Sequence, residues 1–477
     1  MKPASRVGLL IWAAITFLVA ASLLVIYEWR GAGELKILIQ TGPISDLTVT
    51  LYSVAFTWLL AGLLLLLLYS NRITSKNIFL WGGFFLTAFV YLNLLRERAN
   101  YGDVEYYARA ALDLYAGKPL PPEYLYPPLW ANILELLAPF GEKAIEYFAW
   151  LLNTLSLFAF YFLLAKTIER YNFSPRLAAL TATLFLLVNA TLLRTLFYVQ
   201  VNLHVLNFVL LGILLYRDRP FLSAFMMALA VHLKTSPAIL ILAFLLEMNW
   251  KWLAWFAISM FLVAVPTLIL HGTSPFMDFV NNAFLLTQSH GLSFRDNSFD
   301  SLFTALGEFF NLASLWTRIL VYASKALLAA ATFSVMARCV RNQTFYESSE
   351  HGAKLFNALP PLFILMTLAS PVVWEHHGLF TVLAFLLLLE RLDTPSEWMW
   401  FGFAYFLEFI LPTFDFFPWS YGRLVAPLIV LGLMWRTSQK TETSKFFGAV
   451  NTWLMNLPEF RVGTSLANVN PKNAKSD

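Results

Sequence analysis

Long apolar runs follow one another along most of this chain, and short polar clusters separate them. Runs such as 144–166, 252–270 and 316–337 are long enough to cross about 30 Å of hydrocarbon as helices. They lack the alternation of apolar and polar residues that is typical of strands in a membrane barrel. Because backbone groups within a bilayer must be hydrogen-bonded inside the protein, the pattern predicts an all-α, polytopic transmembrane protein.

We expect about fourteen membrane-spanning helices from this pattern. The expected spans are 8–27, 49–69, 78–95, 144–166, 177–196, 201–216, 220–234, 236–249, 252–270, 316–337, 355–370, 377–391, 397–411 and 423–436. A further apolar stretch at 299–312 could form an interfacial helix. The run at 8–27 follows a basic segment, but no cleavage site is recognisable before Glu28. We therefore interpret it as a first span rather than a signal peptide.

The basic residues indicate how the chain crosses the membrane. Lysine and arginine are concentrated in alternate loops, and such loops face the cytoplasm. This rule places both termini in the cytoplasm and the loop at 96–143 outside. We expect a multi-pass protein of the cell membrane in three parts: an N-terminal transmembrane hairpin at 1–77, a core at 78–436 that includes this large extracytoplasmic loop, and a cytoplasmic tail at 437–477.

Composition agrees with a membrane protein and excludes several classes of function. Charged residues make up 13% of the 477 residues, whereas soluble domains contain about 25%. The net charge of +4 is spread along the chain and indicates no nucleic-acid partner. The single cysteine, Cys339, excludes a disulfide framework and a CxxC metal or redox site. We expect no metal site.

Several unusual polar residues fall toward one face of the membrane when the spans are drawn in this way. Polar groups at membrane depth are costly and usually mark a substrate path. Their convergence toward the extracytoplasmic face predicts a site there. The residues concerned are Asp103, Glu105, Gln200, Asn202, Lys234, His290, Arg295, Asp296, Asn297, Trp374, Glu375, His376 and His377.

Asp103 lies in a polar, aromatic stretch a few residues after an expected span. A carboxylate at the lipid–water boundary can act as a general base toward an incoming hydroxyl, and an ordinary solvated aspartate is the alternative. Glu105 is the second carboxylate of this stretch and points to a different face if the segment is helical. Tyr126, in a proline-rich turn, could stack on a sugar ring or belong to the interfacial aromatic belt. Tyr106 and Tyr107 are further candidates for substrate binding.

Amides, a lysine and two histidines supply the other candidate side chains. Gln200 and Asn202 could bracket hydroxyl groups, or cap helix ends. Lys234 follows an apolar helix and could neutralise a phosphate as a point charge, or extend along its apolar stem to water. The sequence Trp-Glu-His-His at 374–377 suits hydrogen bonding to a phosphate or a leaving group, and an interfacial Trp–His cluster is the alternative. Adjacent histidines point to different helix faces, which disfavours a shared metal ion.

The order of these motifs resembles that of the membrane glycosyltransferases of the GT-C superfamily, and within it of glycosyltransferase family 87, the polyprenyl-phosphate-mannose-dependent mannosyltransferases. The matching residues run in family order over much of the expected core. They are Gly102-Asp103 with Tyr106-Tyr107 and Ala110, Gly117, Tyr126-Pro127-Pro128-Leu129, Gln200-Val201-Asn202, Leu233-Lys234 with Pro237, Asn297-Ser298, and Ser370-Pro371 with Trp374 and His376-His377.

The resemblance implies a GT-C-like fold and a sugar donor carried as a polyprenyl monophosphate, with mannose as the expected sugar. It implies Asp103 as the general base of an inverting transfer to a hydroxyl of a lipid or glycan acceptor on the outer face. No cofactor is implied beyond the donor substrate, and the expected partners are donor, acceptor and membrane lipids. The residues expected to contact substrates are Glu105, Tyr106, Tyr107, Tyr126, Gln200, Asn202, Lys234, Asn297, Trp374, His376 and His377.

Some features depart from the family pattern. Val199 stands where the family usually has a glycine before the glutamine, and Asp296 stands where a glutamine or a polar equivalent usually precedes the Asn-Ser pair. The two spans before residue 78 look added to the usual core. A multi-span transporter or flippase of a lipid-linked or small polar solute is the alternative class, although the chain has no clear internal repeat. A glycan polymerase or ligase that uses a diphosphate carrier is a third interpretation.

Overall fold

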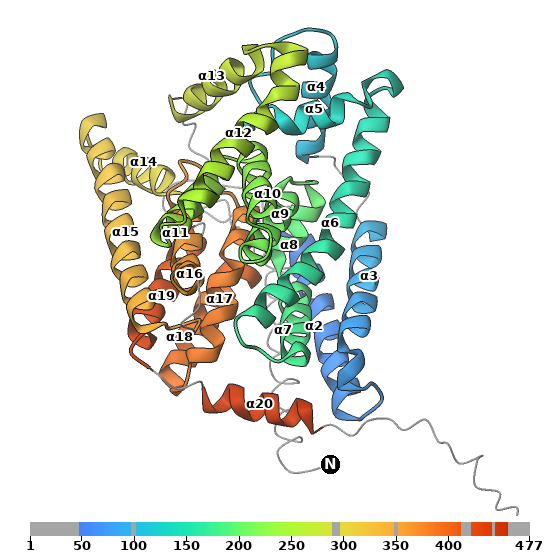
Figure 1. Cartoon of the computed structure of the whole chain (residues 1–477), viewed down its shortest axis with the longest axis vertical. Helices are drawn as coiled ribbons and strands as arrows, with labels where there is room; N and C mark the ends of the chain where they lie inside the picture. Colours follow the sequence, from blue (N-terminus) through green and yellow to red (C-terminus); the bar gives the residue numbers. More distant parts are fainter. Residues whose placement is uncertain are drawn as a thin grey trace, which may run out of the picture.

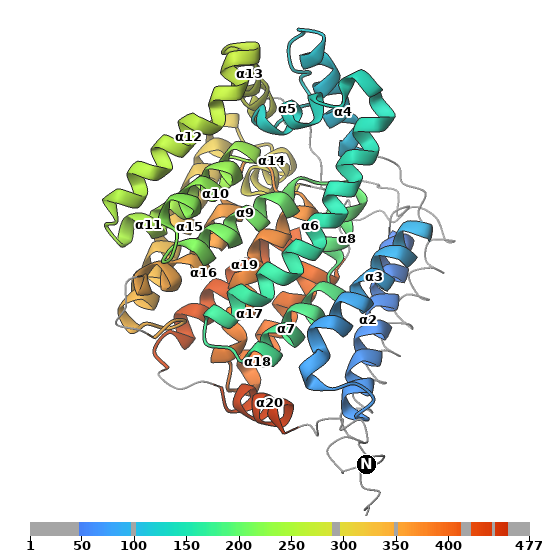
Figure 2. The same ribbon diagram turned by 45° about the vertical axis from the view of Figure 1, so that its right-hand side comes forward.

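The computed structural model describes residues 47–96, 102–288, 296–347, 352–411, 421–440 and 444–456. The expected first span at 8–27 lies outside these ranges, as do His290 and Arg295. Every regular element within them is a helix, which confirms the predicted all-α fold. Figure 1 shows the molecule along its shortest axis, and Figure 2 shows it turned by 45°.

The first part of the described chain contains a helical pair and the helices of the expected outer loop. These elements are α2 (Leu47–Tyr69), η1 (Ser75–Asn77), α3 (Ile78–Arg96), α4 (Gly102–Tyr115), α5 (Leu129–Glu135) and η2 (Ala138–Phe140). The expected loop at 96–143 is therefore largely helical where it is described. Helix α4 is amphipathic, because Val104 and Ala108 are buried while Glu105 and Arg109 are exposed.

The remaining helices form the body of the molecule. Its middle part consists of α6 (Glu142–Arg170), α7 (Pro175–Leu187), α8 (Ala190–Phe197), α9 (Asn202–Leu215), α10 (Pro220–Leu233), η3 (Ser236–Leu240), α11 (Ile241–Leu246), α12 (Trp250–His271), α13 (Ser274–Gln288) and α14 (Phe299–Phe309). Its last part consists of α15 (Ser314–Asn342), α16 (Ala353–Leu368), η4 (Glu375–Thr381), α17 (Val382–Leu388), η5 (Leu389–Arg391), α18 (Pro395–Tyr405), η6 (Phe406–Ile410), α19 (Gly422–Thr437) and α20 (Lys445–Met455).

Three helices, α6, α12 and α15, are each long and apolar enough to cross a membrane. Helices α7 and α8 meet the same criteria only as a pair. Several other apolar helices have 10–17 residues, which is less than the about 20 that a full crossing needs. In the described part of the chain, length and composition thus support three spans, or four if α7 and α8 form one. The larger number stays a prediction.

The expected single helix at 177–196 is broken in the structure. Helix α7 ends at Leu187, and α8 leaves it at an angle of 65°. Asn189 causes a new helix start, because its side chain accepts a hydrogen bond of 2.9 Å from the backbone nitrogen of Leu192. The bend turns the C-terminal end of α8 toward α9, and the short connection between them carries Gln200.

The helices are arranged along the long axis of the molecule. Helices α4, α5 and α13 gather at one end, whereas α20 lies across the opposite end (Figures 1 and 2). Helix α6 runs from the first end toward the second. Helices α2 and α3 pack against α7, at the edge of the body. The polar residues discussed next come from the start of α4, the turn before α5 and the ends of neighbouring helices.

Candidate active site

Five segments that are distant in sequence meet at the candidate site. They are the start of α4, the proline-rich turn before α5, the connection from α8 to α9, the end of α10 and the start of η4. Hydrogen bonds between side chains join the first three, and contacts of Lys234 and Asn202 join the last two to the third. Most of the residues expected at a substrate site are thus brought together.

Asp103 occupies the first turn of α4, and Tyr107 lies one turn further on the same face. Tyr107 is buried, whereas Glu105 and Tyr106 are exposed on the other side of the helix. The phase of α4 therefore separates the expected candidates. Asp103 and Tyr107 face the cluster, and Glu105 and Tyr106 lie apart from it.

The side-chain amide of Gln200 connects Asp103 to two tyrosines. Its Nε2 donates a hydrogen bond to Oδ2 of Asp103. Its Oε1 accepts hydrogen bonds from the hydroxyls of Tyr126 at 3.0 Å and Tyr107 at 3.4 Å. Burial raises the pKa of both phenols, so they stay protonated and donate. Gln200 is completely buried, so these contacts fix which of its ends faces the carboxylate.

Tyr124 fixes the turn that presents Tyr126. Its hydroxyl donates to the carbonyl of Pro127 at 3.2 Å and accepts from the backbone nitrogen of Ala131 at 3.0 Å. Tyr124 is fully buried. The stretch that the sequence suggested as a sugar-stacking surface therefore anchors itself through Tyr124, and Tyr126 directs its hydroxyl to Gln200.

The backbone before Gln200 adopts an unusual conformation. Val199 has a φ of 52°, in the left-handed region that glycine tolerates and β-branched residues rarely adopt. The nitrogen of Gln200 donates to the carbonyl of Thr195 at 2.9 Å, which closes the end of α8. The position where the family usually has glycine is thus one that favours glycine, and here valine occupies it.

Asp103 has the electrostatic properties of a weak base. Burial raises the pKa of its carboxyl to about 6, and the hydrogen bond from Gln200 and the positive charge of Lys234 oppose this rise. Its Oδ1 accepts no hydrogen bond from any described residue. The carboxyl is therefore mostly ionised near neutral pH and keeps one oxygen available for a proton.

Lys234 follows the last residue of α10 and reaches into the cluster. Its Nζ donates to Oδ1 of Asn202 at 3.0 Å and lies 5.7 Å from the ring centre of Tyr126 and 5.3 Å from that of Phe380. Asn202 in turn donates through Nδ2 to the carbonyl of His376 at 3.2 Å. Aromatic faces and an amide oxygen thus hold the ammonium group in place.

The contacts of His377 define its tautomer. The backbone nitrogen of Trp374 donates to Nδ1 of His377 at 3.0 Å, so the neutral ring carries its proton on Nε2. That Nε2 lies beside Nζ of Lys234. Nε2–H and the lysine ammonium are both donors, so neither accepts a hydrogen bond from the other. Two nitrogen donors therefore meet at one point, an arrangement that an anionic oxygen between or beside them would complete.

Asn297 lies beside the histidine turn through its backbone. Its nitrogen donates to the carbonyl of Val373 at 2.7 Å. The nitrogen of Val373 donates to Oδ1 of Asp296 at 2.8 Å, and Ser298 donates to the same carboxylate through both its nitrogen and its hydroxyl at 3.0 Å. Asp296, which departs from the family pattern, thus fastens the 296–298 segment to the residues just before Trp374.

Glu375, one of the polar residues expected toward the extracytoplasmic face, belongs to a buried ionic group whose two arginines were not expected. Glu375 accepts from Nη2 of Arg423 at 2.9 Å and lies 3.4 Å from Nε of Arg194. Arg423 also donates to the carbonyls of Glu408 and Leu411. An arginine inside an otherwise apolar run, such as Arg194 in the expected span, is the sequence signal that indicates such a group.

No group of three or more histidine, cysteine, aspartate or glutamate side chains that could hold a metal ion occurs among the described residues. The titratable groups of the candidate site are one carboxylate, one lysine, a histidine pair and the phenols of Tyr107 and Tyr126. Together with membrane-length apolar helices, this buried polar cluster is the arrangement of a membrane-embedded enzyme.

Comparison with known proteins identifies the kind of enzyme. The model of glycosyltransferase family 87 matches residues 124–371, which is more than half of the chain. The chain belongs to glycosyltransferase family 87 and is a membrane glycosyltransferase. No curated protein and no solved structure matches it.

The matched range includes part of the site and leaves part outside. Tyr126, Gln200, Asn202, Lys234 and Asn297 lie within it. Asp103 lies before the matched range. Trp374, His376 and His377 of the histidine turn lie after it. Their association with the matched part rests on the hydrogen bonds described above.

Proposed function

We propose that this glycosyltransferase transfers a sugar, with mannose as the first candidate, from a polyprenyl-phosphate donor to an acceptor hydroxyl. Asp103 acts as the general base, and the reaction inverts the anomeric carbon. The observation that carries this proposal is the connection of one carboxylate of raised pKa, Asp103, to the Lys234–His377 donor pair within a single cluster. A proton acceptor and an anion-binding group are the two parts that such a transfer needs.

The proposed step can be written with these residues alone. The acceptor oxygen attacks the anomeric carbon and forms the new glycosidic bond, while Asp103 takes the hydroxyl proton. The bond between the anomeric carbon and the phosphate oxygen breaks, and its electron pair remains on the phosphate. Lys234 and Nε2–H of His377 donate to the phosphate oxygens as their negative charge grows. The departing group is polyprenyl phosphate.

The place of the cluster suits a lipid-linked donor. It lies at helix ends close to α4 and α5, near one end of the long axis (Figure 1). The distribution of basic loops supports an extracytoplasmic position for this end. A prenyl chain could remain in lipid while its phosphate enters the cluster from the membrane boundary. A donor of this kind needs no nucleotide on that face.

The decisive experiment replaces the proposed base. The Asp103→Asn variant, assayed in membranes with polyprenyl-phosphate mannose as donor, should lose about 10²–10⁴-fold of the transfer rate. Asp113→Asn changes another aspartate of α4 in the same way and serves as the matched control, with activity close to that of the unaltered enzyme. Transfer at the unaltered rate by Asp103→Asn would refute the assignment of the base.

Donor competition tests the other half of the proposal. Unlabelled polyprenyl-phosphate mannose should suppress transfer of the labelled sugar, whereas a polyprenyl diphosphate sugar should not. The opposite preference would favour an enzyme that uses a diphosphate carrier. Movement of labelled solute across proteoliposomes without any covalent product would contradict transfer altogether.

A further inference from the structure

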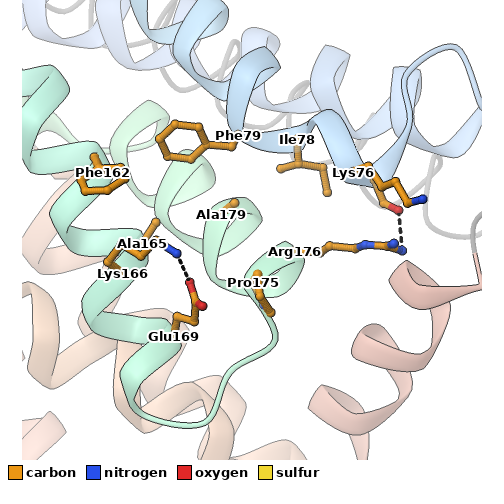
Figure 3. A pocket seen from close by; sticks show the side chains of 11 residues that line it. Lys76, Ile78, Phe79, Phe162, Ala165, Lys166, Glu169, Pro175, Arg176 and Ala179 are labelled. Carbon is orange, nitrogen blue, oxygen red and sulfur yellow. Dashed lines mark hydrogen bonds and ion pairs between the residues drawn. The ribbon is translucent and has the colours of Figure 1, made fainter.

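A cavity lies at the opposite end of the molecule from Asp103, between η1–α3, the end of α6 and the start of α7. Figure 3 shows its side chains, and its volume is about 280 Å³. This is near the lower end of the range of small-molecule sites, about 300–1,000 Å³. The cavity is therefore large enough for a headgroup and the beginning of an attached chain, but not for a whole lipid.

One wall of this cavity is apolar and open to the outside of the body. Phe79 of α3 and Phe162 of α6 face one another edge to face, with ring centres 6.0 Å apart. They remain 37% and 47% exposed. Ile78 and Ala165 also line the cavity. Exposed aromatic rings on adjoining helices of a membrane protein are typical of contact with lipid chains.

The other wall carries three cations against a single carboxylate. Lys76, Lys166 and Arg176 line it together with Glu169. Lys166 pairs with Glu169 at 2.8 Å. Arg176 donates to the hydroxyl of Ser75 at 3.0 Å, as Figure 3 shows by a dashed line. The excess of positive charge makes the cavity complementary to an anion.

The position of the cavity along α6 places it at a membrane boundary. Lys143 and Lys166 stand near the two ends of this helix, about 35 Å apart at 1.5 Å per residue. This distance exceeds the about 30 Å of the hydrocarbon core. Helix α20 lies at the same end, and Arg176 also donates to the carbonyl of its Leu454 at 3.4 Å. Helix α20 is thus tied to a side chain that lines the cavity.

We propose that this cavity binds the phosphate headgroup of an anionic phospholipid, with the first part of an acyl chain against Phe79 and Phe162. Basic pockets between membrane helices on the positively charged side recognise such headgroups. The bound lipid would join the α2–α3 pair to the α6–α7 part of the body, because the cationic wall comes from both. This site is separate from the transferase site and does not depend on the reaction proposed for it.

The test uses the full-length protein in nanodiscs of phosphatidylcholine with added phosphatidylglycerol. Native mass spectrometry measures how much phosphatidylglycerol stays bound. In the double variant Lys76→Gln/Lys166→Gln, retention should fall about tenfold or more. Ala179→Leu fills the cavity without changing charge and should reduce retention as well, because Ala179 lines it. Both variants should keep the melting temperature of the unaltered protein in phosphatidylcholine alone.

The same helix offers a matched control. Lys143 pairs with Glu146 at 2.6 Å in the same i, i+3 spacing as Lys166 with Glu169, but at the other end of α6. Lys143→Gln should retain phosphatidylglycerol fully. Equal retention by the double variant and this control would overturn the proposal. Complete displacement of phosphatidylglycerol by soluble glycerol phosphate would also overturn it, since a free-phosphate site needs no lipid chain.

Discussion

The amide nitrogen of Gln200 donates a hydrogen bond to the carboxylate of Asp103 across 97 positions of the chain. The opposite end of the same amide accepts from two buried tyrosine hydroxyls. Gln200 is therefore held in one orientation, and it presents a donor to the proposed base. This contact lowers the pKa of Asp103 against the effect of burial and keeps the carboxylate usable near neutral pH.

The first prediction concerns the pH dependence of the unaltered enzyme. A general base must be unprotonated, and the pKa of Asp103 is raised to about 6. The value of kcat/KM should therefore rise with pH, with an acid limb centred near pH 6. Measurement in membranes between pH 4.5 and 8 checks this. A flat profile through this range would mean that another group is the base.

Replacing Gln200 should move that midpoint. In Gln200→Leu the donor to Asp103 is lost, burial is retained, and the pKa of Asp103 rises above about 6. The acid limb of kcat/KM should shift to higher pH, and the rate at pH 7 should fall more than the rate at pH 8. Tyr126→Phe leaves the donor in place and is the milder comparison. An equal loss at every pH would indicate a purely structural effect.

The Lys234–His377 pair should matter more for the chemical step than for donor binding. Lys234→Met removes a charge that acts on the departing phosphate, so kcat should fall about 10²–10³-fold, as for other groups that stabilise developing charge. KM should change much less. Lys251→Met, at an exposed position of α12, is the control and should leave kcat unchanged. A rise in KM with unchanged kcat would mean that Lys234 contributes to donor binding but not to the chemical step.

The buried pair of Glu375 and Arg423 should determine stability. Glu375→Gln leaves the guanidinium without its charge partner, and breaking such a pair costs about 3–5 kcal/mol. A clear fall in melting temperature should follow. Glu375→Leu combined with Arg423→Leu removes one charge of each sign and should recover part of the loss, although Arg194 still loses the carboxylate beside it. A double variant less stable than either single variant would show that the pair itself is strongly favourable.

Gly378 directly follows the histidine pair and has no room for a side chain. A Cβ there would lie 2.6 Å from Oε1 of Glu408 and 3.1 Å from Cγ2 of Thr191. Gly378→Ala should therefore lower the free energy of unfolding by about 1–3 kcal/mol through overpacking. It should also reduce activity, because it would displace His377. Gly432 lies in α19, where an added Cβ would meet nothing within 4 Å. Gly432→Ala should therefore raise the free energy of unfolding by about 0.5–1 kcal/mol. Both effects are measurable by thermal unfolding in detergent.

The helices could largely be predicted from the sequence, because apolar runs determine them directly. Helix α3 begins at Ile78 and α12 ends at His271, within one residue of the expected limits. The break before α8 was missed because the run at 177–196 is mostly apolar and was drawn as one span. Asn189 carried the signal, as a helix-capping residue inside that run.

The candidate site was predictable in its members but not in its contacts. The motifs indicated Asp103, Gln200 and Lys234, yet the pairing of an amide with a carboxylate depends on how distant helices pack. Glu105 was expected to contact substrate, although in a helix it would point to a different face from Asp103. Which face of α4 turns inward depends on the burial of Val104 and Ala108, which the short polar stretch did not reveal.

The left-handed backbone of Val199 has a consequence for how the enzyme fails on heating. A β-branched residue in this conformation carries local strain of about 1–3 kcal/mol, which only the surrounding packing maintains. If the packing of α8 against its neighbours loosens on heating, the strained connection between α8 and α9 relaxes first. Gln200 lies in this connection and then moves away from the carboxylate of Asp103. Catalytic competence should thus disappear at a lower temperature than the helical fold, so that heat inactivation precedes denaturation.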